Sequence, residues 1–207
     1  MYILTGMYLW AMQATDTRSQ ILERMFLDIR RNGFQGLRAD KVIADMPVTK
    51  GALYHYFPNK QAIGTAVIEE ILRPNYLRFY RELDRWEGNP IDKLQEHLRF
   101  LADNATDEDV ALGCPLNNLV QEMSPLDEDF RLRMKNIVDG IHKSIAAALL
   151  RGQMNGQVRA QANAYQVAQF FFASVEGAYS VAKVRKDAAA FKSNMELLSN
   201  FLDTLRA

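Results

Sequence analysis

Apolar residues recur every three or four positions along most of the chain, which is the spacing that places them on one face of an α-helix. Strict alternation of apolar and polar residues, which marks a half-buried strand, is hard to find over five or more positions. The pattern therefore predicts an all-α protein of about nine helices. The first buried stripe comprises Ile21, Leu22, Met25, Phe26 and Ile29.

Capping residues and helix breakers divide this pattern into elements. Asp16 or Thr17 is a suitable N-cap for the first helix, Gly33 ends that helix, and Asn59 is a suitable N-cap for the long fourth helix. The predicted helices span approximately residues 17–32, 38–45, 49–57, 60–86, 90–104, 116–123, 125–151, 160–185 and 188–205.

Pro74 lies inside the long fourth helix. Because proline lacks an N–H and its ring clashes with the carbonyl four residues earlier, it costs about 3 kcal/mol in a straight helix. We therefore predict a kink near residues 70–74.

The composition excludes several classes of protein. Apolar residues make up 48% and charged residues 24% of the 207 residues, which is ordinary for a globular chain and too apolar for a disordered one. The single cysteine cannot form an intramolecular disulfide, and it excludes a cysteine-based zinc site. The formal net charge is zero, but residues 1–60 carry +3 and the remainder −3, which hints at a polyanionic partner for the N-terminal third.

Residues 1–14 are apolar but lack the Lys or Arg of a secretory signal, and no stretch of the chain is long enough to span a bilayer. We expect a cytoplasmic protein with no membrane partner. Two interpretations of residues 1–14 remain open. They form an additional helix that covers the first domain, or they precede a natural translation start at Met7 or Met12.

Residues 38–57 have the pattern of a helix, a turn and a second short helix, which is typical of a DNA reader. Thr49 places a hydroxyl at a helix N-terminus, where free N–H groups attract a phosphate. Lys50 adds a mobile cation, and Gly51 lets the helix backbone approach DNA closely. The candidate DNA-binding residues are Arg38, Thr49, Lys50, Gly51, Tyr54, His55 and Lys60.

The chain resembles the TetR family of bacterial transcriptional regulators at residues 21–34 (ILERMFLDIRRNGF), at 42–44 (VIA) and above all at 48–60 (VTKGALYHYFPNK). This resemblance implies an N-terminal three-helix domain that binds a palindromic operator. It also implies a larger C-terminal helical domain that forms a ligand pocket and a dimer interface. We accordingly expect a helix-turn-helix domain over residues 1–60 and a ligand-binding and dimerisation domain over residues 61–207.

One residue departs from the family pattern. Pro47 stands in the turn where the family usually has a glycine. Because proline cannot adopt a positive φ, the turn must take another geometry, for example with the second helix ending a residue early.

The C-terminal helices carry the candidates for the other two sites. Residues 168–181 are apolar on nearly all faces, so their helix must be buried on several sides, by its own domain and by a partner subunit. The candidate ligand-binding residues are Phe79, Phe100, Glu122, Phe171 and Tyr179. Apolar residues of the last helix recur at heptad spacing, which indicates a dimer interface, with packing inside one domain as the alternative. The candidate interface residues are Gly177, Phe191, Met195, Leu198 and Leu202.

We find no motif of an enzyme and predict no catalytic residue, no metal and no cofactor. The predicted function is a ligand-responsive transcriptional regulator that represses from a near-palindromic operator as a homodimer. A small, mostly apolar effector is expected to release it. The alternative is a helical carrier or enzyme that retains the DNA-binding head without its function, and salt-dependent binding to random DNA would distinguish the two.

Overall fold

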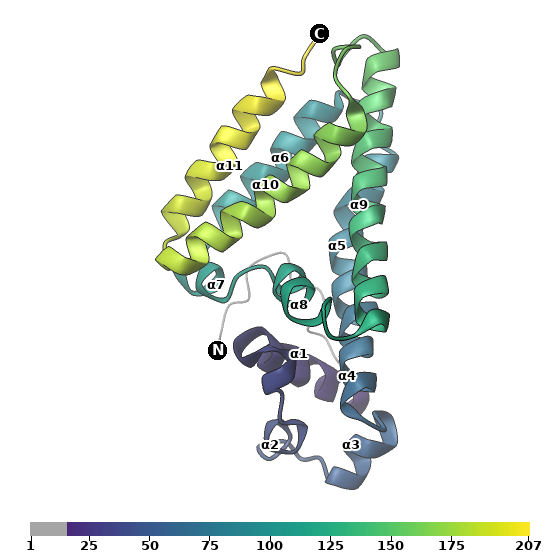
Figure 1. Cartoon of the computed structure of the whole chain (residues 1–207), viewed down its shortest axis with the longest axis vertical. Helices are drawn as coiled ribbons and strands as arrows, with labels where there is room; N and C mark the ends of the chain where they lie inside the picture. The colour runs from purple at the N-terminus through teal and green to yellow at the C-terminus, as the bar shows by residue number, and fades with distance from the viewer. Residues whose placement is uncertain (1–15) are drawn as a thin grey trace. The chain divides into compact units, whose positions relative to one another are not determined.

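The computed structural model describes residues 16–207, of which 79% are helical (Figure 1). The only extended pairing among them is an isolated bridge between Val158 and Arg206. The prediction of an all-α fold is confirmed. The elements are α1 (Thr17–Gly36), α2 (Ala39–Val42), α3 (Lys50–Tyr56), α4 (Lys60–Ala66), η2 (Val67–Leu72), α5 (Arg73–Asp84), α6 (Pro90–Asn104), α7 (Asp107–Leu112), α8 (Pro115–Met123), α9 (Glu128–Met154), α10 (Ala164–Arg185) and α11 (Ala188–Asp203). The two interpretations of residues 1–14 concern residues outside this range.

Side-chain caps begin the helices where the sequence predicts them. The Asp16 carboxylate accepts a hydrogen bond from the Ser19 N–H at 3.0 Å, and the Asn59 side chain accepts one from the Ala62 N–H at 2.8 Å. Gly33 interrupts the first helix with a φ of +73°, but helical structure resumes after it and continues to Gly36. The first helix therefore contains a break where the sequence suggested an end.

Residues 67–72, next to the kink predicted near 70–74, form the π-helix η2. The kink itself stays a prediction. The η2 segment lies directly before Arg73, whose N–H bonds to the carbonyl of Ile68, five residues earlier. An α-helical register would instead direct the missing N–H of Pro74 at the Glu70 carbonyl. The wider turn changes that register before the proline is reached.

Contacts divide the chain into two compact units. The head unit consists of the described part of residues 1–75 together with Pro115–Lys135, and the body unit consists of Tyr76–Cys114 and Asn136–Ala207. Within the head unit, α1 packs against α2, α3, α4, η2 and α8. Within the body unit, α11 packs against α6, α7 and α10. The functional boundary at residue 60 stays a prediction.

The apolar stripe of α11 faces its own unit. Phe191, Met195, Leu198 and Leu202 are each at most 4% exposed. The folded chain already covers these four side chains, and their contact with a partner subunit stays a prediction. Packing inside one domain, which was the alternative, accounts for their spacing. Gly177 differs, since it lies on the exposed face of α10.

Candidate nucleic-acid interface

Helix α3 is built so that one face is fixed in the core and the other is free. The Thr49 hydroxyl caps it by accepting a hydrogen bond from the Ala52 N–H at 3.1 Å. Leu53 and Phe57 anchor it, with exposed fractions of 0% and 1%. The opposite face therefore presents its side chains to solvent. The exposed residues on it include Lys50, Gly51, Tyr54 and His55.

The turn before α3 accommodates Pro47 without a left-handed residue. Helix α2 ends at Val42, three residues before the predicted end. The chain then makes short turns, in which the Met46 N–H bonds to the Ile43 carbonyl at 3.0 Å and the Val48 N–H bonds to the Met46 carbonyl at 2.7 Å. No residue of this turn has a positive φ. The early end of α2 is thus the adjustment that a proline at this place requires.

Asp40 on α2 joins two of the candidate DNA-binding side chains. The Lys50 ammonium lies 2.8 Å from one Asp40 carboxylate oxygen, and the Tyr54 hydroxyl donates to the other at 3.1 Å. The hydrogen bond from Lys50 lowers the pKa of Asp40, and the same bond raises the pKa of Lys50. Asp40 was not among the sequence candidates, because its separation of 10 and 14 residues from its partners follows no local pattern.

Gly51 is not required by the packing of the protein itself. A Cβ added there would meet only the Thr49 hydroxyl oxygen, at an ordinary 3.8 Å. Arg38, at the start of α2, and His55 are exposed as well. The space beside Gly51 is therefore open on the same surface that carries Lys50 and Tyr54.

Two other candidates have contacts that the sequence did not indicate. Lys60, predicted to contact DNA, donates a hydrogen bond to the Gln35 carbonyl at 2.9 Å. Glu122, predicted to contact a ligand, accepts hydrogen bonds from the N–H groups of Phe34 and Gln35 at 2.9 and 2.6 Å. Both residues thus bind the last turn of α1.

The remaining ligand candidates belong to the body unit. Phe79 stacks on the ring of His97 with centroids 3.8 Å apart. The Tyr179 ring lies 4.3 Å from that of Phe191. Phe171 is fully buried, whereas Phe100 is 40% exposed. Their role as ligand contacts stays a prediction.

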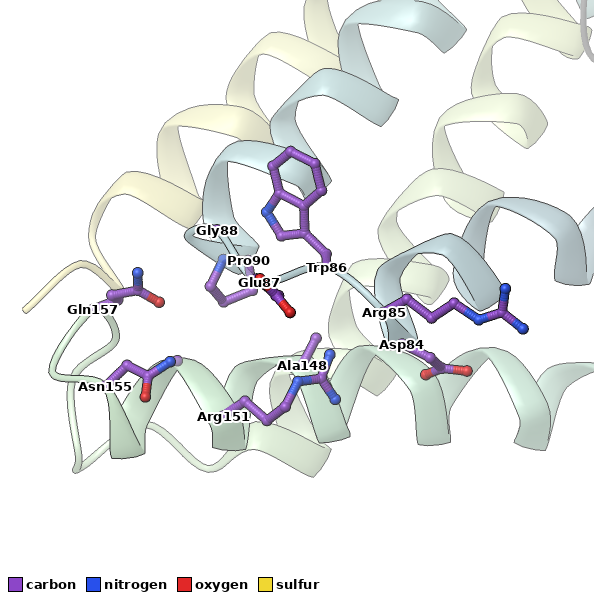
Figure 2. A pocket seen from close by; sticks show the side chains of 11 residues that line it. Asp84, Arg85, Trp86, Glu87, Gly88, Pro90, Ala148, Arg151, Asn155 and Gln157 are labelled. Carbon is purple, nitrogen blue, oxygen red and sulfur yellow. The ribbon is translucent and has the colours of Figure 1, made fainter.

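A cavity of about 470 Å³ opens elsewhere in the body unit. Figure 2 shows Ala148 and Arg151 on α9 and Trp86 on the segment that follows α5. Charged groups of both signs line it, and none of the predicted ligand-binding residues does. The lining residues are Asp84, Arg85, Trp86, Glu87, Gly88, Pro90, Ala148, Arg151, Gly152, Asn155 and Gln157.

A buried polar cluster surrounds the single cysteine. The Cys114 sulfur lies 2.9 Å from the Tyr76 hydroxyl and donates to one carboxyl oxygen of Glu176 at 3.3 Å. The other oxygen of Glu176 is buried without a hydrogen-bond partner. Burial raises the pKa of Glu176 to about 7, although the hydrogen bond from Cys114 opposes the shift. Spacing could not reveal this cluster, because its members come from three distant parts of the sequence.

Helix α1 supports the short helices α2 and α3, and the exposed face of α3 carries cationic and hydroxyl groups. This arrangement defines a helix-turn-helix DNA-binding protein. Residues 29–67 match the family model of the bacterial regulatory proteins of the tetR family, and residues 90–198 match the tetracyclin repressor-like C-terminal domain. The second match alone covers more than half of the chain. The protein therefore belongs to the TetR family of bacterial transcriptional regulators, as the resemblance predicted.

Two bacterial repressors are similar to this protein over almost the whole chain. The HTH-type transcriptional repressor NemR of Escherichia coli K12 is 26% identical over 189 residues, which are 91% of this chain and 95% of that protein. The HTH-type transcriptional repressor DhaR of Mycobacterium sp. strain GP1 is 25% identical over 191 residues, which are 92% and 91% of the two chains. The crystal structure of reduced E. coli NemR superimposes with a TM-score of 0.74 at 24% identity and covers 93% of this chain and 98% of that one.

Among residues 16–207, no helix has the length and apolar character needed to cross a membrane. The same residues contain no group of three or more His, Cys, Asp or Glu side chains arranged to hold a metal ion.

Proposed function

We propose that this regulator is a ligand-responsive repressor that binds a near-palindromic operator as a homodimer and is released by a small, mostly apolar effector. The exposed face of α3 is the observation that carries the DNA-binding part of this proposal. The similarity to the repressors NemR and DhaR over nearly the whole chain supports repression rather than activation.

Lys50 and Tyr54 are the best placed phosphate contacts. Both side chains lie at the exposed edge of α3, next to the open space beside Gly51. Asp40 holds them together by hydrogen bonds to its two oxygens. Since the Lys50–Asp40 pair is exposed to solvent and hence weak, a DNA phosphate competes with Asp40 for the Lys50 ammonium.

The exposed stripe of α10 is the proposed dimer interface. Phe170 is 52% exposed and Val181 is 47% exposed, and the small residues Ala173 and Gly177 lie between them. A Cβ added at Gly177 would meet nothing within 4 Å, so a partner helix can approach closely there. A twofold contact at this stripe presents two identical heads to DNA, which favours a near-palindromic site.

The DNA-binding test uses an operator selected from a random duplex pool by the wild-type protein. Lys50→Ala should weaken binding to this operator and to random DNA alike, because a phosphate contact carries no base information. The slope of log K against log salt should fall by about one unit per subunit. Unchanged affinity and slope in Lys50→Ala would contradict its role as a phosphate contact. Failure of the wild-type protein to bind any duplex in the pool would contradict the proposed function.

Asp40→Asn provides the matched background for this test. Lys50→Ala alone leaves the Asp40 carboxylate without its partner beside the DNA, where it repels phosphates. Comparing Asp40→Asn with the Asp40→Asn/Lys50→Ala double variant removes that repulsion and isolates the loss of the ammonium.

The dimer test introduces a charge into the stripe of α10. Ala173→Arg should yield folded monomers in sedimentation velocity, since a twofold axis brings two arginines together. Asp103→Arg, at an exposed position of α6, is the control and should leave the dimer intact. A dimeric Ala173→Arg protein would place the interface on another surface.

A further inference from the structure

The break in α1 is held by side chains from two other helices of the head unit. Gly33 adopts a φ of +73°, so the N–H groups that follow it leave the regular helical bonding pattern. Phe34 and Gln35 donate these N–H groups to the two carboxylate oxygens of Glu122 on α8, at 2.9 and 2.6 Å. A carboxylate that accepts from two successive N–H groups forms strong, directional hydrogen bonds.

Gly33 has two structural reasons to be a glycine: its positive φ and the nearby carboxylate of Glu122. A Cβ on Gly33 would lie 3.0 Å from each carboxylate oxygen of Glu122, which is tighter than most real contacts of this kind and would displace the carboxylate by a few tenths of an ångström. The positive φ favours glycine at this position, and the close approach of Glu122 adds to that preference.

Lys60 binds the opposite side of the same turn. Its ammonium donates to the Gln35 carbonyl at 2.9 Å and lies 5.1 Å from the centre of the Phe34 ring. The backbone of Gln35 is thus held by an anion at its N–H and by a cation at its carbonyl. The Phe34 ring packs against Phe130 with centroids 4.8 Å apart, which fixes the turn from the core side.

We propose that Glu122 and Lys60 are positioning residues for DNA binding: together they fix the last turn of α1 and thereby the orientation of α2 and α3. Only Leu37 and Arg38 separate that turn from α2, so its direction is passed on to the helix-turn-helix. Functional groups need such support from neighbouring residues to hold a productive geometry. This inference rests on the proposed function.

Charge and positioning predict opposite effects of replacing Glu122 on DNA binding. Removing an acidic residue from a DNA-binding unit should tighten binding to DNA, because repulsion of the phosphates falls. Positioning predicts weaker binding. The two N–H groups bind different oxygens of Glu122, and a glutamine in the same position would present its NH2, which is a donor, to one of them. The salt dependence of binding distinguishes the two possible roles of Lys60. Loss of a phosphate contact lowers the slope of log K against log salt, whereas loss of positioning leaves this slope unchanged.

The experiment measures affinity for the selected operator and its salt slope in the full-length protein. Glu122→Gln and Lys60→Met should each bind about tenfold more weakly than wild type with the slope unchanged. Lys60→Arg keeps a donor for the Gln35 carbonyl and should restore most of the affinity. Glu128→Gln removes an exposed acidic residue from the start of α9 and is the control, with affinity equal to or slightly above wild type.

Amide hydrogen exchange provides a readout inside the protein. Faster exchange at Phe34 and Gln35 is expected in Glu122→Gln, and affinities are normalised to the folded fraction. If Glu122→Gln does not fold, Lys60→Met and Lys60→Arg decide the question. Tighter operator binding by Glu122→Gln, or a reduced salt slope in Lys60→Met, would overturn the proposal. A Lys50→Ala variant with normal binding would instead count against the phosphate contact and leave the positioning role standing.

Discussion

Gly51 and Gly64 are glycines for different reasons. At Gly64 an added Cβ would lie 2.4 Å from the Phe130 ring and 2.6 Å from the Phe34 ring, so packing excludes a side chain. At Gly51 an added Cβ makes only an ordinary contact with Thr49. Packing of the folded chain therefore does not explain the glycine at position 51, whereas the proposed close approach to DNA does.

Substitution of Gly51 by alanine should separate stability from function. Gly51→Ala should stabilise the protein by about 0.5–1 kcal/mol, because alanine favours a helix more than glycine does. Binding to the selected operator should nevertheless weaken, since the added methyl group lies on the DNA-facing surface. Urea denaturation and operator titration measure the two effects, and Gly64→Ala, which should lose stability, is the comparison. A variant that is both more stable and fully active would contradict the close approach to DNA.

Glu176 should make the stability of the protein depend on pH. Its pKa in the folded state is about 7, above the ordinary value of 4.5, because burial disfavours the carboxylate. The folded state therefore holds a proton that the unfolded state releases, and the contribution of Glu176 to stability falls as the pH rises from 4.5 to 7. Glu176→Gln should remove this fall, which amounts to at most about 3 kcal/mol.

The difference between the wild-type and Glu176→Gln denaturation curves at pH 5 and pH 7 measures this effect. His97, whose pKa burial lowers to about 3, is present in both proteins and cancels in the difference. If the two proteins differ in unfolding free energy by the same amount at pH 5 and pH 7, burial does not disfavour the ionised carboxylate of Glu176.

The π-helix before Pro74 shows how a helix accommodates a proline. Because the hydrogen-bonding register has already changed at Arg73, little of the ordinary cost of about 3 kcal/mol remains to be recovered. Pro74→Ala should therefore change the unfolding free energy by less than about 1 kcal/mol, as measured by urea denaturation. A gain of 3 kcal/mol would show that the proline strains the helix.

Spacing and capping residues predicted which segments are helical, because both act within a few residues. Asp16 and Asn59 cap the helices that follow them, as expected. The heptad stripe of α11 was also correctly predicted to be buried, but its spacing does not reveal what buries it. Periodicity measures how apolar one face of a helix is, and that face can meet its own chain or another.

The candidate site was predictable only where neighbouring residues form it. The run from Val48 to Lys60 indicated the exposed face of α3, since Lys50, Gly51, Tyr54 and His55 all lie on that one short helix. The contact between Glu122 and Gln35 joins residues 87 positions apart, and no pattern along the sequence predicts such a pair. The same limit applies to Asp40, which faces Lys50 only because of the turn between α2 and α3.

At the level of assembly, two substitutions should have opposite consequences. Leu198 is 4% exposed, so Leu198→Glu buries a carboxylate in the core of its own unit and should prevent folding. Ala173→Arg, on the exposed stripe of α10, should leave the chain folded and only separate the subunits. Circular dichroism with sedimentation distinguishes the two results. If Leu198→Glu gives folded monomers instead, the heptad stripe of α11 is the better candidate for the dimer interface.

The head unit is assembled from two segments of chain that synthesis delivers at different times. The segment up to residue 75 carries the helix-turn-helix, whereas Pro115–Lys135 carries Glu122 and Phe130. A nascent chain that has emerged only as far as residue 75 has the break at Gly33 but lacks the carboxylate that binds it. If Glu122 positions the last turn of α1 as proposed, α2 and α3 gain their final orientation only after α8 has left the ribosome. An incomplete chain would then not bind the proposed operator with the geometry of the finished protein.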